Sequence, residues 1–375
     1  MNKVIVAFDS FKGSLSSVEA GEAFASGYRD VIPDADIRIF SISDGGEGFS
    51  DAIVAARGGE VVECMVSDPL GRPIVARYAI IDAEIAVISL ASASGLTHLA
   101  PEERNPLLAT TFGTGELILD ALRRGCSRII VGLGGSATTD GGAGMLRALG
   151  YRFYDAEGAE LIQTLDILER AVMVSERDVV PAIRNVDISV AVDVDNPLYG
   201  ERGAACVYAP QKGADSDMVL CLDAALRHYA ELGDGYCGYP ASDIAGVGAA
   251  GGVGYAFVAF LGCVLTSGIE LLLDVIHFEA SLVGATLVVT GEGRIDAQTL
   301  MGKAPSGVLR YAERYGVECI AVGGGVAWCD ELRGSGFSAI YASKPDDMPL
   351  IEAMKPAVAC DNLRAVGRIV AEAAK

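Results

Sequence analysis

The stretch TGEGRIDAQTLMGKAP (290–305) combines residue types that are suited to phosphate chemistry. It holds several glycines, an acid pair, Glu292 and Asp296, and two cations, Arg294 and Lys303. Glycines let a backbone approach a ligand closely, carboxylates hold Mg²⁺, and cations neutralise a migrating phosphoryl group. Asp296 is the candidate ligand of this pair, whereas Glu292 is expected only to shape the turn. An ordinary loop whose charges face water explains the stretch equally well.

Two flanking elements are predicted to position this stretch. An apolar run at 285–289 predicts a buried strand before it. Pro305 predicts the start of a helix, because proline is tolerated in the first helical turn. The stretch is therefore predicted to be a loop that leads from a strand to a helix, where free N–H groups attract anions.

The segment DSFKGS (9–14) follows an apolar run at 3–8 that predicts the first strand. Lys12 could grip a phosphate or a carboxylate, and Ser14 could donate a hydrogen bond to the same anion. Asp9 could orient Lys12 or hold a metal ion. A loop whose polar side chains only cap the next helix is an equal alternative.

The segment DGGEG (44–48) follows a second predicted strand at 36–42. Asp44 and Glu47, placed among three glycines, suit Mg²⁺ or a hydroxyl group better than a solvated turn. In an open α/β sheet, loops of this kind lie at the carboxyl edge, where ligands bind. We therefore expect this loop to lie beside the loop at 9–14.

The segment GLGGSATTDGGAG (132–144) has the pattern of a strand, a loop and a helix start. Gly134, Gly135, Ser136 and Thr138 offer backbone and hydroxyl donors, which a helix dipole could assist in holding phosphate. Glycines that only permit close packing are the alternative interpretation.

Asp193 ends a predicted strand at 188–192 and is a candidate metal ligand or general base. The Asp–Asn–Pro sequence that follows it (195–197) is also typical of a structural turn. Lys212, in QKG (211–213), adds a cation that could bind phosphate.

Three familiar signatures are excluded. GVGAAG (246–251) matches a dinucleotide fingerprint, but the residues before it do not predict a strand. Lys303 is followed by Ala304 rather than by Ser or Thr, so a standard P-loop is absent. The three histidines (98, 228 and 277) lie in no motif that also carries a nucleophilic hydroxyl.

The composition limits the class of protein. A net charge of −21 argues against nucleic acid or an anionic membrane as a partner. Nine scattered cysteines without zinc spacing fit reduced thiols in a cytoplasmic protein. The apolar run at the N-terminus is too short for a signal peptide, and the run at 253–264 is too short to span a bilayer.

Strand-like runs alternate with amphipathic helical patterns, which predicts an α/β fold with parallel pairing. Between 60 and 90 three β runs follow one another without a helix, which predicts antiparallel pairing. We predict a discontinuous Rossmann-like, doubly wound parallel-sheet domain (1–58 and 275–375). An α/β domain with a mixed sheet (59–274) would be inserted into it, with the active-site cleft between the two. A simple division near residue 150 is the alternative.

Taken together, these motifs resemble those of the bacterial glycerate kinase family, of the glycerate 2-kinase type. The matching segments follow the family's order along most of the chain: DSFKGSLS (9–16), DGGEG (44–48), GTGELILDAL (113–122), GLGGSATTDGGAGM (132–145), NPLYG (196–200), PQKGA (210–214), GVGAAGG (246–252), SGIE (267–270) and TGEGRIDAQTLMGK (290–303). The chain departs from the family pattern at Ser43, Phe49 and Ala209, and in the segments 160–168 and 321–325. These departures bear on the substrate more than on the kinase chemistry.

The resemblance implies Mg²⁺- and ATP-dependent phosphorylation of D-glycerate at its 2-hydroxyl. The 132–145 loop would then cradle the ATP phosphates. Asp44, Asp193 and Asp296 would hold Mg²⁺ or activate the hydroxyl, with Asp193 as the leading base. Lys12, Arg294 and Lys303 would bind the substrate carboxylate and the migrating phosphoryl group. A homodimer is compatible with this scheme.

Three alternatives stay open at this point. A kinase for another small hydroxy acid would keep every phosphate-binding residue and differ only in its pocket. An NAD-dependent hydroxy-acid dehydrogenase would need a strand before the glycines at 246–251. A non-catalytic metabolite sensor would not need so many carboxylates and cations beside its glycines.

Overall fold

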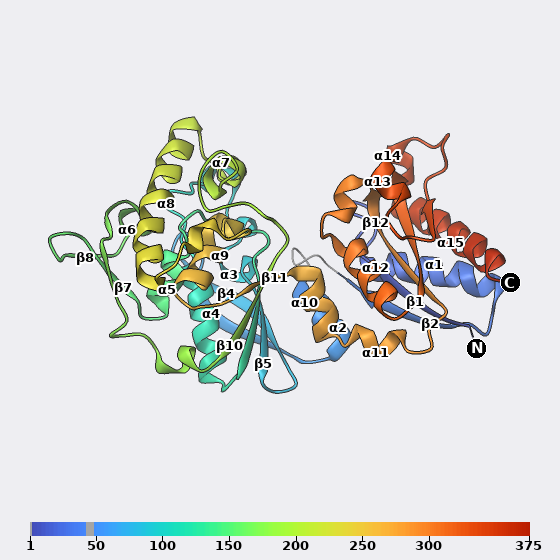
Figure 1. Ribbon diagram of the computed structural model, residues 1–375, viewed down its shortest axis with the longest axis horizontal. Coiled ribbons are helices and arrows are strands. Elements are labelled where there is room, and N and C mark those ends of the chain that lie inside the picture. The colour runs from blue at the N-terminus through green and yellow to red at the C-terminus, as the bar shows by residue number, and fades with distance from the viewer. Residues whose placement is uncertain (1, 43–48) are drawn as a thin grey trace. The chain divides into compact units, whose positions relative to one another are not determined.

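The computed structural model describes residues 2–42 and 49–375 (Figure 1). The chain divides into two compact units, which are treated separately below. Unit 1 contains 2–42, Asp51–Ala56 and Ile269–Lys375. Unit 2 contains 49–50 and Arg57–Gly268.

Unit 1 is built on a sheet of five parallel strands in the order β14-β13-β12-β1-β2. The strands are β1 (Lys3–Phe8), β2 (Asp36–Ser41), β12 (Leu287–Ile295), β13 (Glu318–Val326) and β14 (Ala339–Ala342). In Figure 1 the blue strands of the N-terminus lie beside the orange strands of the C-terminal third, because β1 pairs directly with β12. The predicted parallel α/β sheet is confirmed.

Helices cover both faces of this sheet. On one face, alternate residues of β1, among them Val4, Val6 and Phe8, pack against α1 and α15. On the other face, Phe278 of α11 packs against Phe40 of β2 and Tyr311 of α12. The helices are α1 (Ser17–Val31), α11 (Phe278–Leu282), α12 (Ala304–Arg314), α13 (Asp330–Arg333), α14 (Leu350–Ala353) and α15 (Pro356–Ala373), with α2 (Phe49–Arg57) and α10 (Gly268–Val275) crossing the unit boundaries.

Helix α1 begins with a capping box. The Ser16 hydroxyl accepts a hydrogen bond from the Glu19 N–H, and the Ser16 N–H donates to Glu19 Oε2 at 2.9 Å. These two bonds satisfy backbone donors that a helix start otherwise leaves unpaired. They fix the direction in which the chain leaves the loop at 9–15, which carries Lys12 and Ser14.

One prediction about unit 1 is wrong. The residues after Val289 do not form a loop, because β12 continues to Ile295 and pairs with β13 as far as Val326. A side chain at Gly291 would lie 2.1 Å from the Val322 carbonyl oxygen, so only glycine permits this pairing. The apolar run therefore marks only the first part of the strand.

Unit 2 contains a six-stranded mixed sheet in the order β11-β10-β6-β5-β4-β3. Its strands are β3 (Glu60–Ser67), β4 (Pro73–Ile81), β5 (Ile85–Ser89), β6 (Arg128–Gly132), β10 (Asp187–Val192) and β11 (Leu265–Ser267). Both pairings of β4 are antiparallel and the other three are parallel, which confirms the predicted mixed sheet. A small antiparallel sheet of β7 (Arg152–Tyr154), β8 (Glu160–Leu161) and β9 (Met173–Ser175) was not predicted, since such short strands carry almost no periodic signal.

The helices of unit 2 surround the mixed sheet. They are α3 (Ala91–Ser94), α4 (Phe112–Arg123), α5 (Ala143–Ala148), α6 (Thr164–Arg170), α7 (Ala204–Tyr208), α8 (Ser216–Cys237) and α9 (Ala249–Ala259). Helix α8 stops at Gly238, whose φ of 82° is left-handed. The glycines at 246–251 lead into a kink in α9, where Ala250, Gly251 and Gly252 have positive φ. They follow a short 3₁₀ turn rather than a strand, so the dinucleotide fingerprint lacks its structural context.

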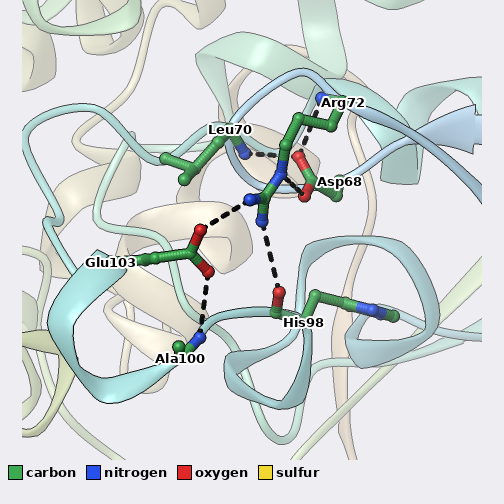
Figure 2. A network of polar contacts seen from close by, with 6 residues as sticks. All are labelled: Asp68, Leu70, Arg72, His98, Ala100 and Glu103. Atoms are coloured by element: carbon green, nitrogen blue, oxygen red, sulfur yellow. Dashed lines mark hydrogen bonds and ion pairs between the residues drawn. The ribbon is translucent and has the colours of Figure 1, made fainter.

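A polar network anchors the turn between β3 and β4 (Figure 2). Asp68 accepts hydrogen bonds from the N–H groups of Leu70 and Arg72 and from Arg72 Nε at 2.6 Å. The same guanidinium donates from Nη1 to Glu103 at 2.6 Å. Pro69 in this turn accepts a hydrogen bond from the Thr110 N–H at 2.8 Å. The network thus fixes the segment that precedes α4 and supports the glycine-rich loop described below.

Among the described residues, no helix is long and apolar enough to cross a membrane. All nine cysteines are free thiols.

Candidate active site

A pocket of about 440 Å³ opens in unit 1. Its lining comes from the loop after β1, the end of β12, the segment between β12 and α12, the residue pair after β14, and the helices α14 and α15. Most of these segments lie at the carboxyl ends of the parallel strands, where the sheet topology predicts ligand binding. Of the predicted site residues, Lys12, Ser14, Arg294, Asp296 and Lys303 line this pocket together.

The cations of the pocket differ in their surroundings. Lys12 is exposed, and among the described residues it has neither an ion pair nor a hydrogen bond. Arg294 is 73% exposed, and its Nε lies 3.3 Å from Asp296 Oδ2. Lys303 Nζ lies 3.8 Å from Glu292 Oε2. Because these contacts are long or absent, all three side chains can turn to an anionic ligand.

The two acids of the TGEGRID segment have structural contacts as well as access to the pocket. Glu292 Oε1 accepts a hydrogen bond from the Thr299 hydroxyl at 2.8 Å. Asp296 caps the 3₁₀ turn at Ala297–Leu300, because its Oδ1 accepts from the Gln298 N–H at 3.0 Å. Glu292, which was expected only to shape the turn, also lies in the pocket lining.

The Ser14 hydroxyl is buried and has no hydrogen-bond partner among the described residues. Gly13, with a φ of 76°, turns the chain so that the Ser14 N–H donates to the Phe11 carbonyl at 2.8 Å. A buried hydroxyl without a partner costs free energy, so a ligand or a water molecule is expected to accept or donate there.

Several lining residues were missed by the sequence analysis. Lys344 lies two residues after the end of β14, so applying the carboxyl-edge rule to that strand would have found it. Asn362, Leu350 and Met354 belong to helical segments near the C-terminus, far from every glycine-rich motif. No local sequence signal marks these three.

In unit 2 the glycine-rich loop runs from the end of β6 to α5. Gly134 is half-buried and Gly135 is exposed, with a φ of 74°. The N–H groups of Gly134, Gly135 and Ser136 have no hydrogen-bond partner among the described residues. By contrast, the buried Ser136 and Thr138 hydroxyls pair with each other at 2.9 Å. Of the predicted backbone and hydroxyl donors, the loop therefore offers the three backbone N–H groups, while these two hydroxyls bond to each other.

Asp140 controls the start of α5. Its Oδ2 accepts from the Thr111 N–H and hydroxyl, both at 2.8 Å, and from the Gly144 N–H at 3.2 Å. Its Oδ1 accepts from the Gly142 N–H at 3.1 Å. Burial raises the pKa of the Asp140 carboxyl, and the four donated hydrogen bonds oppose that rise. Because Asp140 already uses these donors, the helix start is closed to the phosphate that the sequence analysis expected there.

Lys212 lies beneath the loop. Its side chain is 2% exposed, and its Nζ donates to the Thr138 carbonyl oxygen at 2.5 Å. Burial lowers the pKa of Lys212 to about 7, although the Asp140 carboxylate opposes this shift. Its observed role is to support the loop from within.

The remaining predicted carboxylates belong to unit 2 or lie outside the described residues. Asp193 is exposed at the end of β10, and its Oδ1 accepts from the Gly268 N–H at 3.1 Å. Asp44 and Glu47 lie outside the described residues. Within 2–42 and 49–375, no group of three or more His, Cys, Asp or Glu side chains could hold a metal ion by itself.

Fold and site together define an α/β protein with a pocket at the carboxyl edge of a parallel sheet, lined by side chains of both charges. The comparison with known proteins is more specific. A model of the glycerate kinase family matches residues 4–375, and the chain belongs to that family.

Named relatives cover most of this chain. The glycerate kinase of Bacillus subtilis strain 168 is 43% identical over 358 residues, covering 95% of this chain and 94% of the relative. The glycerate 2-kinase of Escherichia coli K12 is 43% identical over 329 residues, with coverage of 86% and 85%. A crystal structure of "putative glycerate kinase 2" from Salmonella typhimurium LT2 is similar over 100% of this chain and 98% of that chain, with a TM-score of 0.86 and 42% identity.

Proposed function

We propose that the protein transfers the γ-phosphoryl group of ATP to the 2-hydroxyl of D-glycerate, which gives 2-phosphoglycerate and ADP. Its membership of the glycerate kinase family supports the reaction, and the similarity to a glycerate 2-kinase supports the position. The structural observation that carries the proposal is the set of cations at the carboxyl edge of the unit 1 sheet, above all Lys12, which is exposed and has no ion pair among the described residues.

Phosphoryl transfer requires positioning and neutralisation of charge more than covalent chemistry. We assign Lys12, Arg294 and Lys303 to the migrating phosphoryl group and the phosphates beside it. The N–H groups of Gly134, Gly135 and Ser136 are assigned to a substrate anion, because consecutive free N–H groups form anion-binding concavities.

The carboxylates that are present suit Mg²⁺, which commonly takes one or two protein carboxylates and completes its shell with water and substrate phosphates. Asp296 in the unit 1 pocket and the exposed Asp193 would hold it, together with Asp44. When bound, the ion neutralises charge on the phosphates. Asp193 is also assigned as the general base, because its exposed carboxylate can accept the hydroxyl proton.

The test is ADP release from Mg²⁺-ATP with D-glycerate, L-glycerate, tartronate, lactate and glycerol, with the product position read by phosphorus NMR. We expect turnover with D-glycerate and a phosphorus signal coupled to the proton on carbon 2. Faster turnover with another hydroxy acid would contradict the assigned substrate. No turnover of ATP with any acid would contradict the kinase activity itself.

A further inference from the structure

We propose that the unit 1 pocket binds an adenine nucleotide. Its phosphates would lie among Lys12, Arg294 and Lys303, and its base would lie against α14 and α15. This inference rests on the proposed ATP-dependent activity and names the site of its nucleotide. It differs from the sequence-based expectation, which placed the ATP phosphates in the glycine-rich loop of unit 2.

The charged and the apolar residues of the pocket lining come from different parts of the chain. The four cations lie at or after the ends of β1, β12 and β14. Most of the apolar lining instead comes from one continuous segment, with Leu350, Ala353, Met354, Ala359 and Leu363. A nucleotide has the same division, since its polyphosphate is charged and the faces of its base are apolar.

The volume of the pocket favours a nucleotide over the small acid. At about 440 Å³, the pocket falls within the range of roughly 300 to 1,000 Å³ that drug-sized ligands and cofactors occupy. Glycerate alone would leave most of this space to water. A purine with its ribose and phosphates fills it.

The charged part of the lining fits a polyphosphate that carries Mg²⁺. Lys12 has no ion pair among the described residues, and the Ser14 hydroxyl is buried without a partner. Three carboxylates, Asp9, Glu292 and Asp296, share the lining with the cations. A bare anion would be repelled by these carboxylates, whereas a magnesium–nucleotide complex presents both signs of charge.

The apolar part of the lining presents unusual exposed surface. Leu350 is 64% exposed and Met354 is 37% exposed. Asn362 on α15 lies among these apolar residues in the lining, and its amide nitrogen lies 3.7 Å from the Met348 sulfur. Its carbonyl oxygen has no partner among the described residues. A primary amide that offers a donor and an acceptor on one edge can pair with adenine.

Lys344 stabilises the apolar part of the lining and is not assigned to the phosphates. Its Nζ donates to the Pro345 carbonyl at 2.8 Å and to the Met348 carbonyl at 3.2 Å. These bonds close the turn that leads into α14. Lys344 is therefore a positioning residue in this proposal.

The glycine-rich loop of unit 2 lacks the corresponding features. Its cation, Lys212, is buried and bonded to Thr138, and the donors at the start of α5 are bonded to Asp140 or Thr111. Three free N–H groups are enough for one carboxylate or one phosphate. They do not provide a surface for a base.

The first test needs no variant. The full chain is photolabelled with 8-azido-ATP and Mg²⁺, and the modified peptides are identified by mass spectrometry. We expect the label within 343–363, with loss of labelling when excess ATP competes. Competed labelling confined to peptides of 91–260 would overturn the proposal.

The second test measures the Kd of Mg²⁺-ADP and of Mg²⁺-GDP by calorimetry. Asn362→Leu should weaken ADP binding by about 10-fold, which is the scale of one lost bidentate base contact. Asn362→Asp should reduce the preference for adenine over guanine by at least a similar factor, since a carboxylate accepts from both guanine N–H groups. Equal ADP affinity in all three proteins would overturn the proposal.

The two proposals fail in different ways. If the wild type releases ADP with D-glycerate but labels only in unit 2, the kinase function stands and the nucleotide assignment is wrong. If the wild type labels within 343–363 but turns over no acid, the nucleotide site stands and the proposed reaction is wrong.

Discussion

The unit 1 pocket and the unit 2 loop use similar residues in opposite ways. Each follows a parallel strand, and each combines glycine, a hydroxyl residue and a lysine. In the pocket, Lys12 is exposed without an ion pair and the Ser14 hydroxyl lacks a partner among the described residues. In unit 2, the Ser136 hydroxyl of the loop and Lys212 beneath it are buried and hydrogen-bonded inside the protein. The same residue types are therefore available to a ligand in the unit 1 pocket, whereas in the unit 2 loop they stabilise the protein's own structure.

Burial explains the difference. A charge taken out of water is costly unless it is paired, so Asp140 and Lys212 must hold fixed partners. Those partners restrict the loop to one conformation. An exposed ammonium such as that of Lys12 carries no such cost and keeps its hydrogen-bonding capacity for a ligand.

The largest effect should come from removing a ligand-facing charge in the pocket. Lys12→Ala should lower kcat for D-glycerate phosphorylation by about 100-fold or more, the usual scale for lost stabilisation of a transferring group. The Tm should stay within about 2 °C, since the side chain has no partner to lose. Steady-state kinetics and circular dichroism measure both quantities.

Lys375→Ala is the matched control, because it removes an exposed lysine at the far end of the chain. Its kcat should equal that of the wild type. A kcat for Lys12→Ala within threefold of the control would remove Lys12 from the site.

The next largest effect should be on stability and should come from the loop. Asp140→Ala leaves buried donors on Thr111, Gly142 and Gly144 without an acceptor. We expect unit 2 to lose about 3 kcal/mol or more of its free energy of unfolding, at roughly 1 to 3 kcal/mol for each buried group left unpaired. Urea denaturation followed by circular dichroism measures this loss. An unchanged midpoint would show that the network does not hold the loop.

A smaller effect concerns the pH dependence of stability. Burial lowers the pKa of Lys212 to about 7 in the folded protein, below the ordinary value of 10.5. Between these pH values the unfolded chain binds more protons, so the contribution of Lys212 makes stability rise as the pH increases from 7. That contribution is lost as the pH falls through 7. Urea midpoints of the wild type should therefore rise between pH 7 and 8.5 relative to those of Lys212→Met. Parallel profiles would contradict the buried, depressed lysine.

The smallest effect should come from Ser14→Ala. Removing a buried hydroxyl without a partner should leave stability unchanged or raise it by up to about 1 kcal/mol. The KM for ATP should nevertheless rise several-fold, since the hydroxyl would have bound the ligand. A clear loss of stability with unchanged KM would reverse this assignment and make Ser14 a structural residue like Ser136.

The sequence predicts those parts of the site that depend on local patterns. The parallel strands at both ends of the chain follow from hydrophobic periodicity, and the placement of Lys12 follows from the carboxyl-edge rule. Such patterns do not predict which polar side chains are already hydrogen-bonded within the folded protein. The hidden position of Lys212 and the use of the α5 donors by Asp140 depend on tertiary packing that no spacing encodes.

The missed residues have a similar explanation. The extension of β12 to Ile295 depends on glycines that allow close pairing with β13, although glycine usually signals a loop. Asn362 and Leu350 lie on segments with ordinary helical composition, and only the fold brings them to the pocket. Lys344 was within reach of sequence reasoning, because it lies just after the end of β14.

The most direct test of the contrast is the Kd of Mg²⁺-ADP for Lys12→Ala and Lys212→Met, measured side by side at pH 8 by calorimetry. The affinity for Mg²⁺-ADP should depend on Lys12, which faces the ligand, and not on Lys212, which supports the loop. We predict at least 10-fold weaker binding for Lys12→Ala and a change below threefold for Lys212→Met. The reverse order would contradict the account, because the nucleotide would then depend on the glycine-rich loop of unit 2.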